Sequence, residues 1–256
     1  MKSILPRVAG LIGAAIAFQT ASAQFTGKLV YEIDRPKEKL VMTYYQSGTA
    51  AHVEAYNITT NNGVTDTTTV NPQDTILFDF ANSNETHLQW RYQRAMKTRY
   101  TDDVLTAATT AKGKSLGTTT VTNKGADTAN GYNCTHFVLT TTSQFGSSTR
   151  DVWVTGDLGP APTAWVLGSY LYFTPGFPTF TKLTAAGANG IVVKSTASNA
   201  RQGVISVMNL VVVDTHTPNP ALFQVPSYYT VFDRTGFTLP YGKDRLKGKK
   251  TCYRSR

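Results

Sequence analysis

From residue 25 onward, the sequence alternates apolar and polar side chains over short stretches that end in turn residues. In the stretch FTGKLVYEI, positions 29, 31 and 33 share one face of an extended chain, and Lys28 and Glu32 share the other. A period of two indicates a β-strand with one buried face, and Asn, Asp, Gly, Pro and Ser between the stretches indicate turns. The sequence therefore predicts about ten antiparallel strands, at residues 25–33, 40–45, 51–58, 75–80, 86–92, 116–123, 190–197 and 203–215 and in both arms of a hairpin within 131–159.

Helical spacing of apolar residues is rare in this chain. It occurs in residues 163–173, where Trp165, Leu171 and Tyr172 cluster before Pro175, and more weakly in residues 91–106. Proline ends a helix because it cannot continue the backbone hydrogen bonding. We therefore expect one or two short helices beside the strands.

The predicted strand at residues 203–215 is apolar on both faces, whereas a strand with one face in water would alternate. We expect it to be covered on both sides, by a helix, an enclosed cavity or a second sheet. The periodicity of the sequence does not distinguish between these three alternatives. The two faces are Val204, Met208, Leu210 and Val212, and Ile205, Val207, Val211 and Val213.

The first 23 residues have the pattern of a secretory signal peptide. Lys2 and Arg7 precede an apolar run at 8–18, which is too short to span a membrane. The small residues 21–23 predict cleavage after Ala23, so the mature protein is expected in the periplasm or outside the cell. We expect residues 24–240 to form a single β-rich domain and residues 241–256 to form a basic, disordered tail.

The positive charge is concentrated at the two ends of the chain. Of the formal +9, residues 1–23 hold +2 and residues 241–256 hold +6, which leaves +1 for residues 24–240. A nearly neutral body argues against a general nucleic-acid surface. The basic tail could instead bind an anionic membrane surface.

The hairpin at 131–159 carries one of the two cysteines and one of the four histidines. Cys134 and His136 share a strand face with Tyr132, and they could bind a metal ion or form a nucleophile pair. Either site needs further ligands or an orienting group from distant strands, and no CxxC, HxxxH or HExxH spacing occurs. We therefore predict no metal, cofactor or catalytic residue, and interpret the hairpin as scaffold.

Two states remain open for the cysteines. In an oxidising compartment, Cys134 and Cys252 could form a disulfide, whose long closed loop would contribute about 4 kcal/mol. The alternative is a buried Cys134 and a free Cys252.

Several stretches together resemble a secreted bacterial family known as domain of unknown function 4412. They are GKLVYEI, GYNCTHFVL, DVWVTGDLG and PALFQVPSYY, and the resemblance covers most of residues 25–232. The family is similar to the lipoprotein-carrier (LolA-like) fold, a strongly curved antiparallel sheet, or half-barrel, with helices over its concave side. The resemblance implies a lidded cavity and no catalytic residues.

The sequence thus predicts a non-enzymatic periplasmic or cell-envelope protein that binds a hydrophobic ligand, such as a lipid or acyl chain, inside a half-barrel. We expect Met208, Leu210, Trp153 and Tyr132 at the cavity, and Trp165 and Tyr172 in the lid. The alternative is a protein-interaction module with a side-chain-filled core, and a hydrolase is third.

Overall fold

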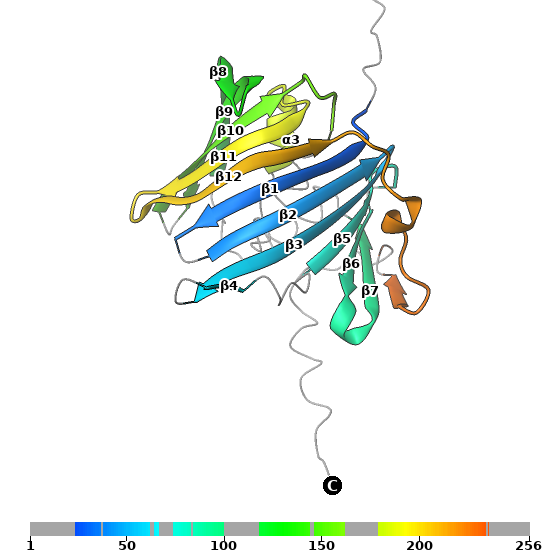
Figure 1. Cartoon of the computed structure of the whole chain (residues 1–256). Helices are drawn as coiled ribbons and strands as arrows, with labels where there is room; N and C mark the ends of the chain where they lie inside the picture. Colours follow the sequence, from blue (N-terminus) through cyan, green and yellow to red (C-terminus); the bar gives the residue numbers. More distant parts are fainter. Residues whose placement is uncertain are drawn as a thin grey trace, which may run out of the picture.

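The fold is one strongly curved β-sheet with few helices (Figure 1). The computed structural model describes residues 24–36, 38–61, 64–66, 74–82, 84–99, 118–143, 146–161, 179–233 and 235. The strands are β1 (Gly27–Arg35), β2 (Glu38–Ser47), β3 (Ala50–Asn61), β4 (Val64–Asp66), β5 (Asp74–Asp79), β6 (Asn84–Gln89), β7 (Arg94–Arg99), β8 (Thr118–Ala129), β9 (Tyr132–Ser143), β10 (Gly146–Thr155), β11 (Ile191–Asn199), β12 (Gly203–Asp214) and β13 (Thr230–Asp233). The helical elements are η1 (Trp90–Tyr92), α3 (Thr179–Ala185) and η2 (Pro220–Phe223).

Most of the sheet consists of two meanders: the first contains β1, β2, β3, β5, β6 and β7, and the second contains β8 to β12. Its strand order is β13-β7-β6-β5-β3-β2-β1-β12-β11-β10-β9-β8, and β4 pairs only with β3. The meanders join where β1 lies antiparallel to β12, with Lys28 opposite Asp214 and Asp34 opposite Val207. Every pairing is antiparallel except that of β13 with β7. The predicted fold class, a mainly β, curved antiparallel half-barrel, is therefore confirmed.

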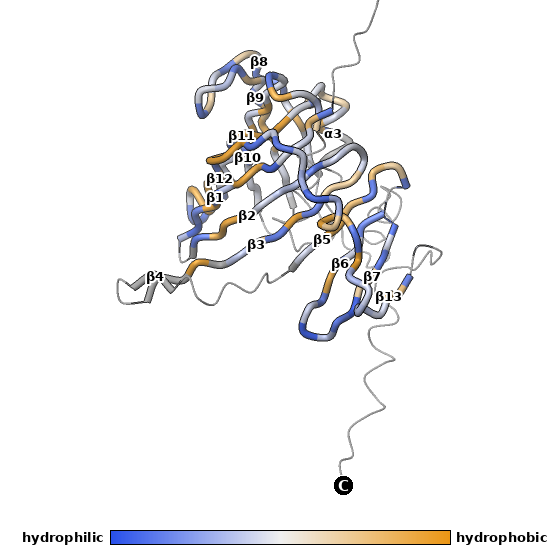
Figure 2. Tube along the Cα trace, turned by 45° about the vertical axis from the view of Figure 1, so that its right-hand side comes forward, coloured by the Kyte–Doolittle hydropathy of each residue, from blue (hydrophilic) through white to orange (hydrophobic). Residues whose placement is uncertain are grey.

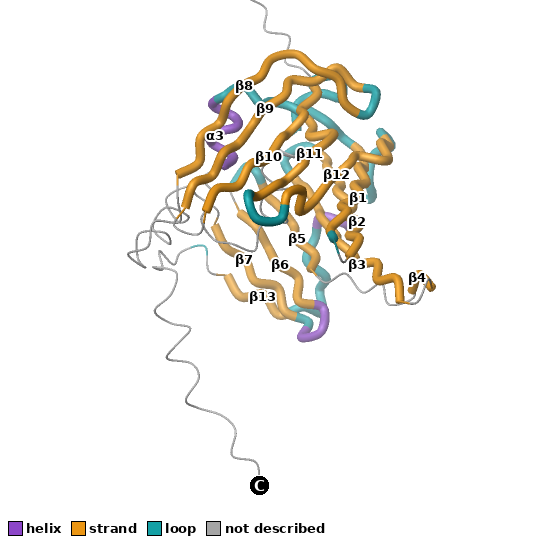
Figure 3. The backbone as a smooth tube through the Cα atoms, turned by 90° about the vertical axis from the view of Figure 1, so that its left-hand side faces the viewer, coloured by secondary structure: helices purple, strands orange, loops and turns teal. Residues whose placement is uncertain are grey.

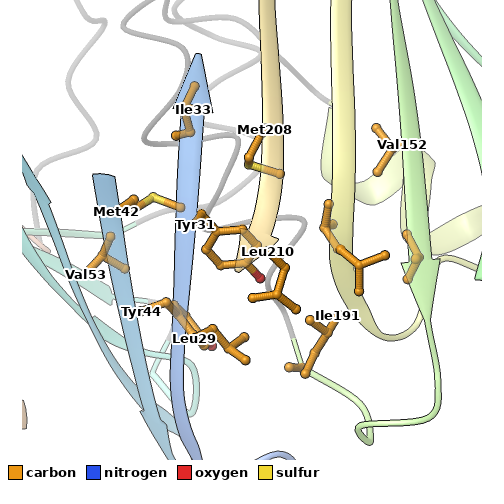
Figure 4. Close-up of a cluster of buried hydrophobic side chains, with 14 of the residues drawn as sticks. Leu29, Tyr31, Ile33, Met42, Tyr44, Val53, Val152, Ile191, Met208 and Leu210 are labelled. Atoms are coloured by element: carbon orange, nitrogen blue, oxygen red, sulfur yellow. The ribbon is translucent and has the colours of Figure 1, made fainter. Parts of the chain in front are cut away.

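One face of the sheet carries the hydrophobic core, and we call it the inner face. In β1, Leu29, Tyr31 and Ile33 are fully buried, while the residues between them are partly exposed. Apolar side chains from β5 and from β10, distant strands in the sheet order, belong to the same core cluster. The curvature of the sheet thus wraps the inner face around one core, part of which is shown in Figure 4.

The expectation that β12 is covered on both faces is wrong. Register shifts leave Ile205 and Val211 as extra residues opposite β11 and β1, and such bulges change which side chains point inward. Met208 and Leu210 are buried in the core. Val204, Val211 and Val212 are 56%, 47% and 43% exposed, so this strand has an apolar outer face in contact with solvent.

The predicted helix at 91–106 is wrong where the structure describes it. Residues 91–92 end η1, and Arg94–Arg99 form β7, which pairs with β6. The weak helical periodicity is overridden by this pairing. The predicted helix at 163–173 lies outside the described residues. The described helix α3 was not predicted, and its Leu183 packs into the core.

The residues after β12 cross the outer face of the first meander, and we call residues 215–229 the C-terminal strap. Its Val225 and Tyr229 pack against Leu77, Leu88 and Ala95. Beyond the strap, β13 lies beside β7 (Figure 3). No helix among the described residues is long and apolar enough to cross a membrane.

Candidate functional site

The inner face around β12 is the apolar surface that the sequence predicts for ligand contact. Met208 lies opposite Ile33 on β1 and Ser195 on β11, and Leu210 lies opposite Tyr31. Both predicted residues are buried, at 2% and 6% exposure, among side chains of β1, β2 and β3 (Figure 4). The structure therefore places Met208 and Leu210 together in the buried apolar core of the inner face, and we call the part of this core around them the apolar lining.

Polar groups on the inner face of β2 bond to one another. The Tyr44 hydroxyl donates to Oε1 of Gln46 at 2.5 Å, and Nε2 of Gln46 donates to the Gly48 carbonyl at 3.3 Å. Gln46 is fully buried. Since a buried amide is costly unless it is hydrogen-bonded, these contacts let polar side chains occupy the apolar lining.

A positively charged end borders this lining. Arg150 lies two residues before Val152 on β10, and its Nη1 donates to Oγ of Ser195 at 3.1 Å. Burial, and then repulsion from the guanidinium of Arg35, lower the pKa of Arg150 to about 10. The positive charges of Arg150 and Arg35 therefore lie close enough to act on one another at this end of the inner face.

Trp153 and Tyr132 lie away from the centre of this lining. Trp153 alternates with Val152 and Val154, so its ring points to the opposite face of β10. The ring stacks on His136 with centroids 4.5 Å apart, and its Nε1 donates to Asp127 at 2.8 Å. Trp153 and Tyr132 are partly buried and pack against the edge of the core cluster.

The remaining predicted residues can be placed only in part. Trp165, Tyr172 and Cys252 lie outside the described residues. Cys134 is buried and has no disulfide partner among the described residues, and its Sγ donates to the Tyr132 carbonyl at 3.5 Å. Burial is the main cause that raises the pKa of this thiol. The disulfide between Cys134 and Cys252 remains a prediction.

The hairpin histidine makes a local polar contact. Nε2 of His136 lies 2.8 Å from Oδ1 of Asp151, and its Nδ1 lies 3.9 Å from Oδ2 of Asp127. Within the described part of the chain, no group of three or more His, Cys, Asp or Glu side chains is arranged to hold a metal ion. These contacts orient His136 against Trp153 within the sheet.

Sequence reasoning missed Arg150, although a signal for it was present. Arg150, Val152 and Val154 alternate along one strand, which assigns Arg150 to the buried face. Its proximity to Arg35 has no such signal, because it depends on the pairing of β10, β11, β12 and β1.

A known protein family matches the part of the sequence that forms most of this sheet. The model of a family described as Domain of unknown function (DUF4412) matches residues 25–229. The chain belongs to this family. In the DUF4412 region lie all of the inner-face residues named above and the C-terminal strap. No curated protein matches the sequence.

Solved structures similar to this DUF4412 protein are distant in sequence. An uncharacterized conserved protein from Thermus thermophilus has 9% identity and a TM-score of 0.44, over 81% of this chain and 89% of that one. The Mycobacterium tuberculosis lipoprotein LppX has 9% identity and a TM-score of 0.31, over 76% and 89%. A putative outer membrane lipoprotein-sorting protein domain from Vibrio parahaemolyticus has 6% identity and a TM-score of 0.32, over 77% and 88%.

Proposed function

We propose that this DUF4412 protein is a non-enzymatic cell-envelope protein that binds the apolar chain of an anionic amphiphile at its inner face. The observation that carries the proposal is the apolar lining around Met208 and Leu210, bordered by Arg150 and Arg35. The lining suits an acyl chain, and the guanidinium groups suit a carboxylate or phosphate head group.

The energetics favour a long chain. Each methylene removed from water contributes about 0.8 kcal/mol, so a dozen methylenes offset the usual costs of association and ordering. Because Met208, Leu210 and Tyr31 are already packed, a bound chain must replace side-chain contacts in the core. The ligand therefore binds with a rearrangement of the inner face.

The proposal also includes a location. Residues 1–23 are expected to direct export and to be removed after Ala23, which places the mature chain in the periplasm or outside the cell. Amino-terminal sequencing of protein purified from the envelope tests this, with Gln24 as the expected first residue. A mature chain that still begins at Met1 argues against export by this signal.

A dye-displacement experiment tests ligand binding. The purified protein should bind an environment-sensitive apolar dye, and dodecanoate should displace it more readily than dodecanol, because only dodecanoate carries a charge for Arg150. In the Arg150→Met variant, this preference should be lost while dodecanol still displaces the dye. The matched control is Arg201→Met, since Arg201 is exposed in the turn between β11 and β12.

Two results would count against the proposal. Folded wild-type protein that binds neither dye nor dodecanoate has no ligand site at the inner face. If Arg150→Met and Arg201→Met lose the preference for dodecanoate over dodecanol to the same extent, the head group does not bind at Arg150. Circular dichroism of each variant distinguishes these results from misfolding.

A protein-interaction module is the second candidate, and a specific observation favours it. Val211 and Val212 are adjacent exposed apolar residues near one end of β12, and Val204 is exposed at its other end; exposed apolar patches commonly mark interaction sites. If the inner face binds no amphiphile, crosslinking from these valines in intact cells becomes the decisive experiment. A reproducible protein partner, lost in Val211→Ser/Val212→Ser, would support this second function.

A further inference from the structure

Exposed aromatic side chains gather at one end of the sheet, away from the inner face. Among the described residues, eight large hydrophobic side chains are exposed, and five of them lie in or beside η1 and β13. We call these five the aromatic end patch; they are Trp90, Tyr92, Tyr228, Val231 and Phe232, each at least 42% exposed.

Backbone pairing brings the two parts of the patch together. The Thr230 amide donates to the Gln93 carbonyl at 2.9 Å, and β13 runs parallel to β7 with Thr230 opposite Arg94. This places residues 228–232 beside the η1 turn (Figure 3). The turn itself is fixed by Gln93, whose left-handed backbone (φ 48°) lets its amide donate to the Trp90 carbonyl.

Arginines lie among these rings. The guanidinium carbon of Arg94 lies 5.9 Å from the ring centre of Tyr92 and 5.6 Å from that of Phe232. Arg91 lies 6.0 Å from the ring centre of Trp90. These are cation–π distances, and they hold the positive charges at the same surface as the aromatic rings. The turn is blue in Figure 2 because its arginines and Gln93 are strongly hydrophilic.

The charged residues of the η1 turn are all positive. Residues 90–94 contain two arginines and no acidic residue, and Lys97 and Arg99 follow on β7. The nearest acidic groups on the paired strands lie further from the turn, where Asp233 contacts Lys97 at 4.0 Å and Glu85 is opposite Thr98. The tip of the turn therefore presents aromatic rings and cations together.

This combination fits the headgroup layer of a membrane. Tryptophan and tyrosine favour the membrane–water interface, where the ring body is apolar and its polar group stays hydrated. Arginine places its stem against apolar surface and its guanidinium on phosphate oxygens. A narrow turn can enter a lipid surface, whereas a stable protein interface needs about 800 Å² on each partner. We propose that the aromatic end patch docks on an anionic lipid bilayer, independently of any ligand at the inner face.

Vesicle binding by the full chain tests the proposal. The protein should sediment with vesicles of phosphatidylethanolamine and phosphatidylglycerol. Much less of it should sediment with vesicles of phosphatidylcholine alone. Arg91→Gln/Arg94→Gln should weaken binding by about fivefold for each charge removed. Trp90→Ser/Tyr92→Ser should also weaken binding. The matched controls are Arg201→Gln for charge and Val211→Ser/Val212→Ser for exposed apolar area, and both should bind as wild type does.

A tryptophan probe separates the patch from the basic residues 241–256. In the Trp153→Phe/Trp165→Phe chain, Trp90 is the remaining tryptophan, and its emission should shift to the blue and be quenched by brominated phosphatidylglycerol. The shift should persist when residues 243–256 are deleted. Binding without any change in Trp90 emission, or control variants as weak as the patch variants, would overturn the proposal. If the Trp90 probe chain does not fold, the sedimentation series alone decides. Capture of a protein at Trp90 with no vesicle binding would identify a protein interface instead.

Discussion

Nδ1 of His52 on β3 lies 2.5 Å from the carbonyl oxygen of Leu222, 170 residues further along the chain. His52 is almost fully buried, because the C-terminal strap covers it on the outer face. Its Nε2 lies 2.8 Å from Oε1 of Glu54, and Tyr45 packs edge-on against its ring. One side chain thus connects the strap to the first meander.

We predict that His52→Ala loosens the strap. The Leu222 carbonyl would lose its donor, and a buried group left unpaired costs about 1 to 3 kcal/mol. Urea denaturation should show this loss, and limited proteolysis should cut residues 215–229 faster. His216→Ala is the control, because His216 is 96% exposed, and it should change stability by less than about 0.5 kcal/mol. Equal effects of the two substitutions would contradict this role.

Glu54 should make the stability depend on acid pH. The contact with His52, more than any other cause, holds the pKa of the Glu54 carboxyl below its ordinary 4.5, and Tyr56 also donates to it. A depressed folded pKa adds stability above pH 4.5, and this contribution is lost as the pH falls through the folded value. Wild type should therefore exceed Glu54→Gln in unfolding free energy at about pH 7, and the difference should narrow at about pH 3. A difference that is constant over this range would sink the prediction.

Gly190→Ala should strongly destabilise the fold. A Cβ at this position would lie 2.1 Å from the Thr155 carbonyl oxygen, at the junction of β10 and β11. Backbone atoms cannot move aside as a side chain can, so the loss should reach at least about 2 kcal/mol. At Gly156, a Cβ meets no atom within 4 Å, and Gly156→Ala should be nearly neutral. Thermal melting of both variants compares them, and similar melting temperatures would show that the strands adjust.

Much of this sheet follows from the sequence alone. Alternation predicts β1, because Leu29, Tyr31 and Ile33 each meet the same core, and turn residues mark most strand ends. The bulge at Val211 has no local signal, since it exists only where Val30 and Tyr31 of β1 pair with β12. This bulge and the one at Ile205 move Val212 and Val204 to the face opposite Met208 and Leu210, where they are exposed, so simple alternation assigns these valines to the wrong face.

The candidate site, too, is predictable from the sequence only in part. The sequence identifies Met208 and Leu210, because they are apolar and lie two residues apart on one face of a long strand. The pairing of Arg150 with Ser195 and its repulsion by Arg35 depend on the register of four strands. The aromatic end patch also depends on distant pairing, because the pairing of β13 with β7 brings Phe232 to the same arginine, Arg94, that Tyr92 contacts.

The thiol of Cys134 should react slowly in the folded protein. Burial, followed by the negative charges of Asp157 and Asp127, raises its pKa, so less reactive thiolate is present at a given pH. After reduction, iodoacetamide should modify Cys134 much faster in urea than in buffer, as measured by peptide mapping. Rapid modification in buffer would show that the thiol is accessible. The same map without reductant tests the predicted disulfide, through a linked peptide that contains Cys134 and Cys252.

The join between β1 and β12 has a consequence for the order in which the protein can form. The chain is synthesised amino end first, so β1, β2 and β3 are available to pair well before β12 is. Until then β1 has an open edge, and open edges pair readily with other chains. Pairing between residues so distant in sequence is also intrinsically slow. Until the second meander is available, the first meander is therefore exposed to aggregation, and rapid pairing with β12 or binding by a chaperone would protect it.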